Sequence, residues 1–552
     1  MTHNEEAPYQ PPQNTVAKSG APAATSKPFV FFPVWWWIYL VFFVTLSFVV
    51  SLVENAASQI LLNFTVLLGV FLLLLNWFRR GSASFWWRAT PMLAFIGCLT
   101  FAAAAIRVDD MSGNLVPTRV SFRWQPQPDE LLTQPQQSIQ PEGGIDLLTT
   151  SEKDFPEFLG PGRANRVDVT LATDWEANPP QQIWHKEEFG AGWSGFVAVN
   201  GYAITMEQRG ENELVTCYEI ESGDLVWAHA EVARHQTVPG GVGPRSTPTI
   251  AGGRVYALGA TGILLCLEGG DGSLVWKQNL LELIDTTPEE ESDLVQWGRS
   301  ASPLVDGDRV IVPLGISKTA SGEWKAGASL IAFDAATGDE LWRQGEHQVS
   351  YSSPTLMELG GLRQIVVVCE SEICGHDAIT GEQLWEFAWP GNSAANASCS
   401  QPIQVSDDSL FVSKGYAHGA SLLGIKQVGS EWRVEEVWHK LTVMKTKFTN
   451  AVLHDGFVYG LDDSILSCVD VETGNRQWKR GRYGHGQTLQ VGDNLLVQAE
   501  SGEVALVKLD PDRFTELGRF EPISGKTWNN PCLYGNFLLT RNGQEAACYL
   551  LP

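Results

Sequence analysis

The sequence has little positive charge and few motifs of established chemistry. Its 552 residues include 38 Lys and Arg against 63 Asp and Glu, which gives a formal net charge of −25. Nucleic-acid-binding proteins need a basic surface that displaces counterions from phosphates, so this composition argues against that class. The chain also lacks the phosphate-loop motif GxxxxGK followed by Ser or Thr, and the zinc-protease motif HExxH.

Cysteine is scarce, and no two cysteines are adjacent. The nine Cys form no CxxC and no CxxCH, which removes support for zinc-ribbon, thioredoxin-like and c-type haem proteins. No metal site is predicted, and His418, His439 and His454 are scattered residues of the kind that are usually structural. Cys369 and Cys374 are near enough in sequence to pair in an oxidising compartment, but the spacing does not decide whether they do.

Long hydrophobic runs are confined to the N-terminal part. After a polar tail at residues 1–28, which is predicted to be disordered, apolar runs cover Phe29–Val53, Ile60–Phe78 and Ala89–Ile106. Each is close to the roughly 20 residues that cross a bilayer as a helix. The first run is longer and more aromatic than the apolar part of an ordinary signal peptide, which is the alternative. We therefore predict three transmembrane helices over residues 29–106.

Basic residues predict the orientation of these helices. Arg79, Arg80 and Arg88 lie between the second and third runs, whereas the loop between the first and second holds Glu54 and no basic residue. The positive-inside rule places the arginine loop in the cytoplasm. The prediction is a multi-pass protein of the cytoplasmic (inner) membrane, with everything after Ile106 on the periplasmic side. Residues 107–154, rich in Pro and Gln, are predicted to be a linker that spaces the rest from the membrane.

A short cassette repeats through the remainder of the chain: an acidic residue, three residues, Gly, three residues, Trp. Its five intact copies carry Gly223 and Trp227, Gly272 and Trp276, Gly338 and Trp342, Gly381 and Trp385, and Gly474 and Trp478. Such a period predicts stacked supersecondary units. Glycine suits a turn with positive φ, and the Trp is expected to pack against a neighbouring unit. Ten residues before the Trp the repeats hold small residues, expected to be buried packing positions: Cys217, Cys266, Ala332, Gly375 and Cys468.

Each unit is predicted to be a blade of four short strands, because apolar segments alternate with turn residues. The outer strands are marked by Trp184, the five cassette Trp, Trp438 and, as a degenerate copy, Phe520. The segment around Trp184 lacks inner strands, and the C-terminal segments Cys532–Thr540 and Ala546–Leu550 lack an outer one. Joining the two ends closes a ring without exposed sheet edges. The fold class is therefore an all-β, eight-bladed β-propeller over residues 155–552, with seven blades or an open solenoid as alternatives.

The cassette resembles the repeat of the PQQ-like, quinoprotein-type β-propellers, a family that includes quinoprotein dehydrogenases and BamB-like assembly proteins. The stretches Phe155–Pro161, Glu207–Gly210, Gly243–Thr249 and Tyr256–Gly262 are similar to a membrane-anchored bacterial subgroup. Within the family, the resemblance implies either a non-enzymatic scaffold or a dehydrogenase with an adjacent-cysteine disulfide, a calcium ion held by Glu and Asn, and a catalytic Asp. This chain has no adjacent cysteines, so no cofactor is predicted, and PQQ remains an unsupported alternative.

A candidate ligand site lies at the mouth of the propeller channel, on the face opposite the cassette turns. Cations near that face would form a positive mouth that attracts an anionic ligand or an acidic peptide. The alternative is that they pair with nearby carboxylates such as Glu289, Glu290, Glu291 and Asp293. The candidate residues are Gln208, Arg209, Arg245, Arg299, Lys414, Lys445, Lys447, Arg482 and His485.

The function that these observations favour is a non-catalytic, membrane-anchored extracytoplasmic scaffold. Its partner would be an envelope protein or an extracytoplasmic ligand, in a setting such as envelope assembly. The alternatives are a PQQ-dependent oxidoreductase and an extracytoplasmic anion sensor. A fold alone does not choose among them, because one fold carries many activities.

Overall fold

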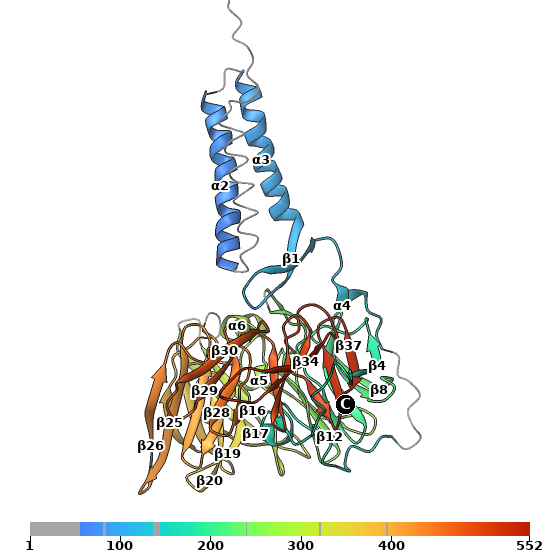
Figure 1. Cartoon of the computed structure of the whole chain (residues 1–552), viewed down its shortest axis with the longest axis vertical. Helices are drawn as coiled ribbons and strands as arrows, with labels where there is room; N and C mark the ends of the chain where they lie inside the picture. The colour runs from blue at the N-terminus through green and yellow to red at the C-terminus, as the bar shows by residue number, and fades with distance from the viewer. Residues whose placement is uncertain (1–55, 81–83, 136–143, 239, 319–321, 393–395) are drawn as a thin grey trace, which may run out of the picture. The chain divides into compact units, whose positions relative to one another are not determined.

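The structure is a computed structural model that describes residues 56–80, 84–135, 144–238, 240–318, 322–392 and 396–552. The chain divides into two compact units, Met1–Phe101 and Ala102–Pro552. The first unit is helical and contains α2 (Ala56–Arg80) and most of α3 (Phe85–Ala105). The second unit consists mainly of antiparallel sheets (Figure 1).

The described helices support one membrane span rather than three. Helix α3 (Phe85–Ala105) is long and apolar enough to cross a bilayer, whereas the apolar stretch of α2 over Phe64–Arg79 is shorter than a span requires. The predicted first span, Phe29–Val53, lies outside the described residues. The prediction of three transmembrane helices is therefore not supported by the described residues.

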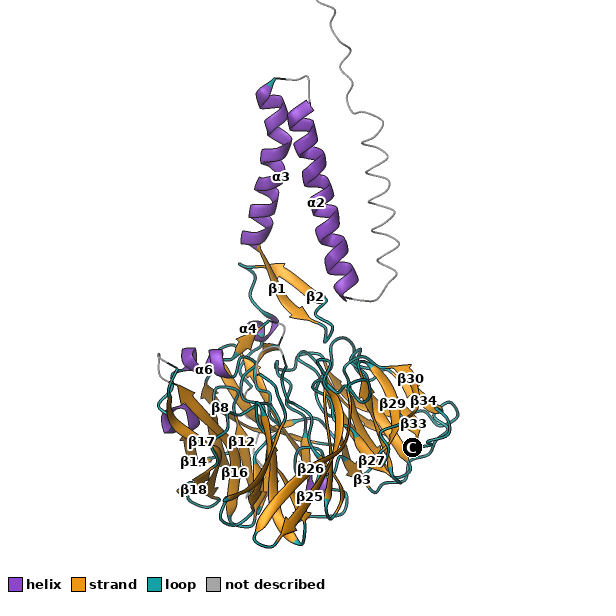
Figure 2. Ribbon diagram, turned by 90° about the vertical axis from the view of Figure 1, so that its left-hand side faces the viewer, coloured by secondary structure: helices purple, strands orange, loops and turns teal. Residues whose placement is uncertain are grey.

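The segment predicted as a linker contains ordered elements. Strands β1 (Ile106–Met111) and β2 (Pro117–Phe122) form an antiparallel hairpin, which α4 (Pro128–Leu131) follows (Figure 2). Further along, Ile145 donates its N–H to the carbonyl of Gly270 at 3.1 Å, so the chain is bound to the propeller there. The sequence analysis missed the hairpin because each of its strands has only six residues and the Pro and Gln that indicated a linker cluster after it, in Gln125–Pro141.

Eight blades form the propeller within the described residues, as the repeat predicts. Seven have their strands in chain order from the inside outwards. These are β5–β8 (Val197–Val199, Tyr202–Arg209, Asn212–Glu219, Leu225–Val232); β11–β14 (Thr249–Ala251, Arg254–Leu258, Ile263–Glu268, Leu274–Asn279); β15–β18 (Leu304–Asp306, Arg309–Lys318, Trp324–Asp334, Glu340–Gln344); β19–β22 (Thr355–Leu359, Leu362–Val368, Glu372–Asp377, Gln383–Ala388); β23–β26 (Ile403–Ser406, Ser409–Lys414, Gly419–Val428, Glu431–Lys440); β27–β30 (Val452–His454, Phe457–Asp462, Ile465–Asp470, Arg476–Arg482); and β31–β34 (Gln487–Val491, Asn494–Gln498, Val504–Lys508, Glu516–Phe520).

The eighth blade joins the two ends of the domain. Its three inner strands are β35 (Cys532–Tyr534), β36 (Phe537–Arg541) and β37 (Ala546–Leu550), and its outer strand is β4 (Gln181–Lys186) from the beginning of the domain. Strands β37 and β4 lie side by side (Figure 1), and Cys548 of β37 is opposite Trp184 of β4 in the ladder. The predicted closure, and the prediction of eight blades rather than seven, are thereby confirmed.

The remaining short elements connect or cover the blades. Strands β9 (Gln236–Thr237) and β10 (Gly241–Val242) and helices α5 (Leu280–Leu283) and α6 (Pro288–Leu294) lie between blades along the chain. Strand β3 (Arg166–Val167) extends the β31–β34 sheet as a fifth, parallel strand beside β31.

The cassette forms a turn and an inter-blade contact. Gly272 has φ +73°, its N–H donates to the carbonyl of Glu268 at 2.8 Å, and an added Cβ would lie 2.5 Å from the Trp227 ring of the preceding blade. The indole N–H of Trp227 donates to the carbonyl of Gly269 at 3.0 Å. The same close approach of a Trp to the next cassette Gly recurs at Gly223, Gly338, Gly381 and Gly474, so the predicted packing between units is confirmed.

The residue opposite each cassette Trp in the ladder is small, as expected. Cys217 faces Trp227, Cys266 faces Trp276, and Gly375 faces Trp385. These cysteines are free and buried, and Cys369 and Cys374 are free as well.

The β31–β34 blade departs from the pattern at its outer strand. Gly518 occupies the position that Trp holds elsewhere, opposite Leu506. Trp175, from the segment before β4, fills the space: an added Cβ on Gly518 would lie 2.7 Å from it, and its ring meets Phe520 edge-on at 5.6 Å. Phe520 thus belongs to the outer strand as predicted, but a Trp from another part of the chain performs the packing.

Candidate functional site

The mouth face of the propeller is formed by the loop between the second and third strand of each blade and by the connections between blades. The turn of the β1–β2 hairpin is inserted there. Gly113 donates its N–H to Glu500 Oε1 at 2.6 Å, and its carbonyl accepts from Lys447 Nζ at 3.2 Å. Asn114 Oδ1 lies 3.1 Å from Nε2 of His485. Gly113 is buried, and a Cβ at this position would overlap the His485 ring, so the contact requires glycine.

A second contact fixes the hairpin beside the turn. Lys526 Nζ forms an ion pair with Asp110 and donates to the carbonyl of Met111 at 3.0 Å. The same ammonium lies over two indole rings, 4.6 Å from the centroid of Trp193 and 4.1 Å from that of Trp528. Burial lowers the pKa of Lys526, and Asp110 opposes this shift by favouring the charged form. A desolvated cation between aromatic faces and a carboxylate is strongly held.

The electrostatics around His485 keep its ring neutral near pH 7. Burial, and then the positive charge of Lys447, lower the pKa of His485 to about 4. Burial raises the pKa of Glu500, but hydrogen bonds from the N–H groups of His485 and Gly113 outweigh it, and the pKa is lowered overall. Glu500 is therefore ionised and anchors both the hairpin turn and the indole N–H of Trp528, which donates to it at 3.0 Å.

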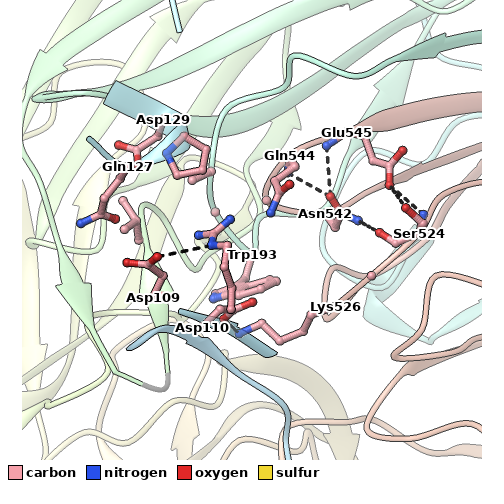
Figure 3. A pocket seen from close by; sticks show the side chains of 18 residues that line it. Asp109, Asp110, Gln127, Asp129, Trp193, Ser524, Lys526, Asn542, Gln544 and Glu545 are labelled. Atoms are coloured by element: carbon pink, nitrogen blue, oxygen red, sulfur yellow. Dashed lines mark hydrogen bonds and ion pairs between the residues drawn. The ribbon is translucent and has the colours of Figure 1, made fainter. Parts of the chain in front are cut away.

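A cavity of about 210 Å³ separates part of the hairpin from the blades (Figure 3). Asp109, Asp110 and Arg119 of the hairpin line one side, while Trp193 and Lys526 belong to the blade connections. The charges that line it are paired: Asp109 with Arg107 at 2.5 Å and Arg119 at 3.8 Å, and Asp129 with Arg234 at 2.6 Å. Among the other charged lining residues, Lys526 pairs with Asp110, and Glu545 accepts a hydrogen bond from the N–H of Ser524 at 2.7 Å.

Two of the nine predicted site residues come together at the hairpin turn, and a third contacts the segment that follows it. Lys447 Nζ lies 3.4 Å from Nε2 of His485, and both contact residues 113–114. Arg209 donates to the carbonyl of Thr133 at 2.9 Å and pairs with Glu207 at 3.2 Å. The sequence analysis expected an acidic peptide to bind at this mouth. In the structure, residues 107–134 of the same chain occupy part of this surface.

The other predicted residues stay at their own blades, where backbone or carboxylate oxygens bind them. Arg245 donates to the carbonyls of Trp297, Val242 and Gly241, and burial lowers its pKa to about 10. Arg299 pairs with Glu291 at 2.8 Å, which is the carboxylate pairing that the sequence left open.

For the remaining four, Gln208 donates to the carbonyls of Gly210 and Ala233. Lys414 donates to the carbonyl of Pro390 at 2.5 Å and burial lowers its pKa to about 8. Lys445 pairs with Asp463 and lies 3.7 Å from Asp462, and Arg482 is exposed at the end of β30.

Arg163 is a buried residue of the channel wall that the sequence analysis missed. It is 6% exposed, pairs with Glu157 at 3.0 Å, and donates to the carbonyls of Ser302, Pro303 and Pro354. These carbonyls lie directly before β15 and β19, the inner strands of two blades. Arg163 therefore ties residues 155–165 to the inner wall of the ring. The surrounding Leu-Gly-Pro-Gly sequence signals a turn but carries no sign of where the turn inserts.

Two observations concern the cofactor set that the resemblance implies for a quinoprotein dehydrogenase. Across the described ranges, no group of three or more His, Cys, Asp or Glu side chains is placed to hold a metal ion. The nine cysteines are free, and none is adjacent to another in sequence. The mouth cations that could bind a carboxylated quinone contact the chain's own oxygens instead, so we derive no chemistry through such a group.

The geometry defines this domain as a closed eight-bladed β-propeller whose mouth is occupied by a segment of its own chain. The profile of the family described as outer membrane protein assembly factor BamB matches residues 179–480, more than half of the chain. The chain belongs to this family.

Two solved structures illustrate the similarity. BamB from Moraxella catarrhalis is 14% identical, over 67% of this chain and all of that chain, with a TM-score of 0.47. Quinohemoprotein alcohol dehydrogenase from Comamonas testosteroni is 12% identical, over 72% of this chain and 80% of that chain, with a TM-score of 0.52. At such identity the second likeness concerns the propeller fold and not its chemistry. A search of curated proteins gives no match.

Proposed function

We propose that this protein is a non-catalytic scaffold that binds segments of envelope proteins at its mouth face, outside the cytoplasm. One observation carries the proposal: the mouth is built to hold polypeptide, because it already binds the turn at residues 112–115 through a carboxylate, an ammonium and an imidazole. A partner segment that presents a similar turn could exchange with the hairpin turn at these three side chains. Membership of the BamB family agrees with a role in binding protein.

The membrane attachment belongs to the same proposal. Helix α3 supplies one span of sufficient length; Arg79 and Arg80 precede it, and Arg88 lies in its first turn. With these arginines on the cytoplasmic side, the chain after Ala105 emerges on the other side of the membrane. The propeller is then an extracytoplasmic domain of the inner membrane.

Photo-crosslinking in intact cells tests the scaffold. A benzophenone amino acid replaces Gln544, an exposed residue of the mouth face, or Asp224, an exposed residue of a cassette turn on the opposite face. We expect a defined envelope protein to be captured from position 544 and not from position 224. Capture from position 224 alone, or from neither position, contradicts the proposal.

The two alternatives are tested with the purified chain. Addition of PQQ and calcium should leave a redox dye unreduced with alcohols or sugars, whereas reduction would establish the oxidoreductase. For the anion sensor, phosphate or sulfate should leave the melting temperature unchanged, because the mouth cations already contact oxygens of the chain. A stabilisation that saturates with anion concentration would favour the sensor.

A further inference from the structure

The β1–β2 hairpin is amphipathic, with a period of two. Ile106 lies opposite Phe122 and Val108 lies opposite Val120, so these four apolar residues share one face. Arg107 and Ser121 form a pair on the other face, where Arg107 also bonds Asp109. A two-stranded hairpin with one apolar face needs something to cover that face.

The apolar face is not the one that meets the propeller. The polar side chains Asp109 and Arg119 line the cavity against the blades, and Asp109 is 8% exposed. On the apolar face, Val120 is 59% exposed and Phe122 is 41% exposed. This arrangement is the reverse of ordinary packing, in which apolar side chains turn towards the domain. The apolar face is therefore directed at a surface other than the propeller.

Trp124 extends this exposed face and is held in a fixed position. Its ring stacks on Phe122 with centroids 4.7 Å apart and an angle of 6°, and it is 65% exposed. Gln125 closes the turn beneath: its N–H donates to the carbonyl of Phe122 at 2.9 Å, and its side chain accepts from the N–H of Phe122 at 3.0 Å. An aromatic pair presented rigidly to solvent is costly unless it has a partner.

Chain connectivity indicates which partner covers this face. Helix α3 ends at Ala105 and β1 begins at Ile106, with no residue between them. The N–H of Arg123 donates to the carbonyl of Ala105 at 2.7 Å, which fastens the Phe122–Trp124 turn to the end of the helix. If α3 spans the bilayer, these aromatic side chains lie at the membrane surface, where Trp is enriched in membrane proteins.

We propose that the apolar face of the hairpin, formed by Ile106, Val108, Val120, Phe122 and Trp124, binds the interfacial layer of the bilayer that α3 crosses. This inference rests on the membrane attachment proposed above. The side chains enter the boundary between headgroups and acyl chains, a depth of about 5–10 Å for interfacial apolar faces. The hairpin then connects the bilayer to the propeller: its apolar face binds lipid, and its turn is bound by Glu500, Lys447 and His485. The mouth face consequently lies beside the membrane surface.

The test uses the full-length chain in phosphatidylcholine vesicles that contain nitroxide-labelled lipid. Cys98 and Cys399, the two cysteines that are not fully buried, are replaced by serine. An environment-sensitive fluorophore is then attached at Trp124→Cys or at Ile379→Cys. Ile379 is the matched control, because it is also 65% exposed but lies on a cassette turn.

We expect the lipid nitroxide to reduce the fluorescence at position 124 by about half, and to leave that at position 379 unchanged, as befits an interfacial depth. Vesicle flotation in alkaline carbonate distinguishes the membrane span of α3 from the binding of the hairpin face to lipid. Flotation without quenching at position 124 would overturn the docking face and leave the membrane span standing. Failure of the protein to float with the vesicles would contradict both the membrane span and the lipid-binding face. A label at position 124 that is shielded from aqueous iodide, but not quenched by lipid nitroxide, would mean that protein covers the face, which also overturns the proposal.

Discussion

Each cassette glycine meets two separate demands. Its positive φ is unfavourable for any residue with a Cβ, and its Cα lies against the indole of the preceding blade. Gly272 meets both demands, with φ +73° and Trp227 in contact, whereas Gly252 has φ +58° and open space around it. The two positions therefore separate the cost of backbone strain from the cost of displacing a tryptophan.

We predict that Gly272→Ala destabilises the propeller more than Gly252→Ala. Both substitutions should lose about 1–2 kcal/mol from the positive φ, and Gly272→Ala a further roughly 1–3 kcal/mol from overpacking against Trp227. The free energy of unfolding, measured in denaturant for the full chain, checks this. Equal losses at the two positions would mean that the Trp contact contributes nothing.

Glu213 is a buried carboxyl whose titration should be visible in stability. Burial raises its pKa to about 7, although the N–H of Ala260, which donates to it at 3.2 Å, and the charge of Arg245 oppose this shift. The folded chain therefore keeps a proton that the unfolded chain has lost, so this group lowers stability as pH rises from about 4.5 to above 7.

We predict that Glu213→Gln stabilises the protein at pH 8 relative to the natural chain, by an amount on the order of 1–3 kcal/mol, with less or no advantage at pH 5. Thermal unfolding of both chains at the two pH values measures the difference. A mutant whose relative stability is the same at pH 5 and pH 8 would contradict the raised pKa.

At the level of elements, the hairpin turn depends on a neutral imidazole. The groups that face His485 are Lys447, which disfavours its charged form, Glu500 and Asp463, which favour it, and the neutral side chains of Ser464, Asn114 and Phe448. Undocking exposes the ring and shifts its pKa upwards from about 4 towards the ordinary value of about 6.5, so His485 takes up a proton on undocking within this window. Docking therefore weakens as pH falls through this window and is unaffected above it.

We predict that amide protection of residues 106–122 falls by up to about tenfold per pH unit between pH 6.5 and 4, after correction for intrinsic exchange. His485→Gln, which does not titrate, should remove this dependence. Hydrogen exchange followed by mass spectrometry measures both chains. A slope that persists in His485→Gln would assign the effect to another group.

On the scale of the whole molecule, ring closure rests on one strand pair. The outer strand β4 has a single ladder partner, β37, and the hydroxyl of Tyr549 donates to Gln182 across the seam at 2.9 Å. Losing β37 removes the only hydrogen-bonded neighbour of β4 within the sheet and exposes two edges.

We predict that deletion of residues 546–552 abolishes amide protection of residues 181–186, far away in sequence, and lowers the melting temperature of the whole propeller. Tyr549→Phe, which keeps the strand and loses one hydrogen bond, should change stability by only about 1 kcal/mol. Retained protection of residues 181–186 in the truncated chain would show that another contact closes the ring.

The repeat was readable from sequence because one cassette carries both its turn and its packing partner. Gly272 and Trp276 are close in sequence, and the small residue opposite Trp276, Cys266, follows from the same register. Contacts between remote segments left no such signal. Trp175 replaces a missing Trp at Gly518, Arg163 reaches carbonyls of two blades, and the hairpin turn at Gly113 meets Glu500. Among the predicted ligand-binding residues, Lys447 and His485 meet at this turn. Arg245 and Arg299 instead bind backbone carbonyls and Glu291 near their own blades.

The seam between β4 and β37 sets an order on biogenesis. Strand β4 is synthesised before its ladder partner β37, so a nascent chain holds an unpaired edge strand while the seven intervening blades are translated. Until β37 has been made, that edge is open to pairing with other strands. Premature termination then leaves an open ring in which β4 has no ladder partner. Quality-control proteases can recognise such an unpaired strand.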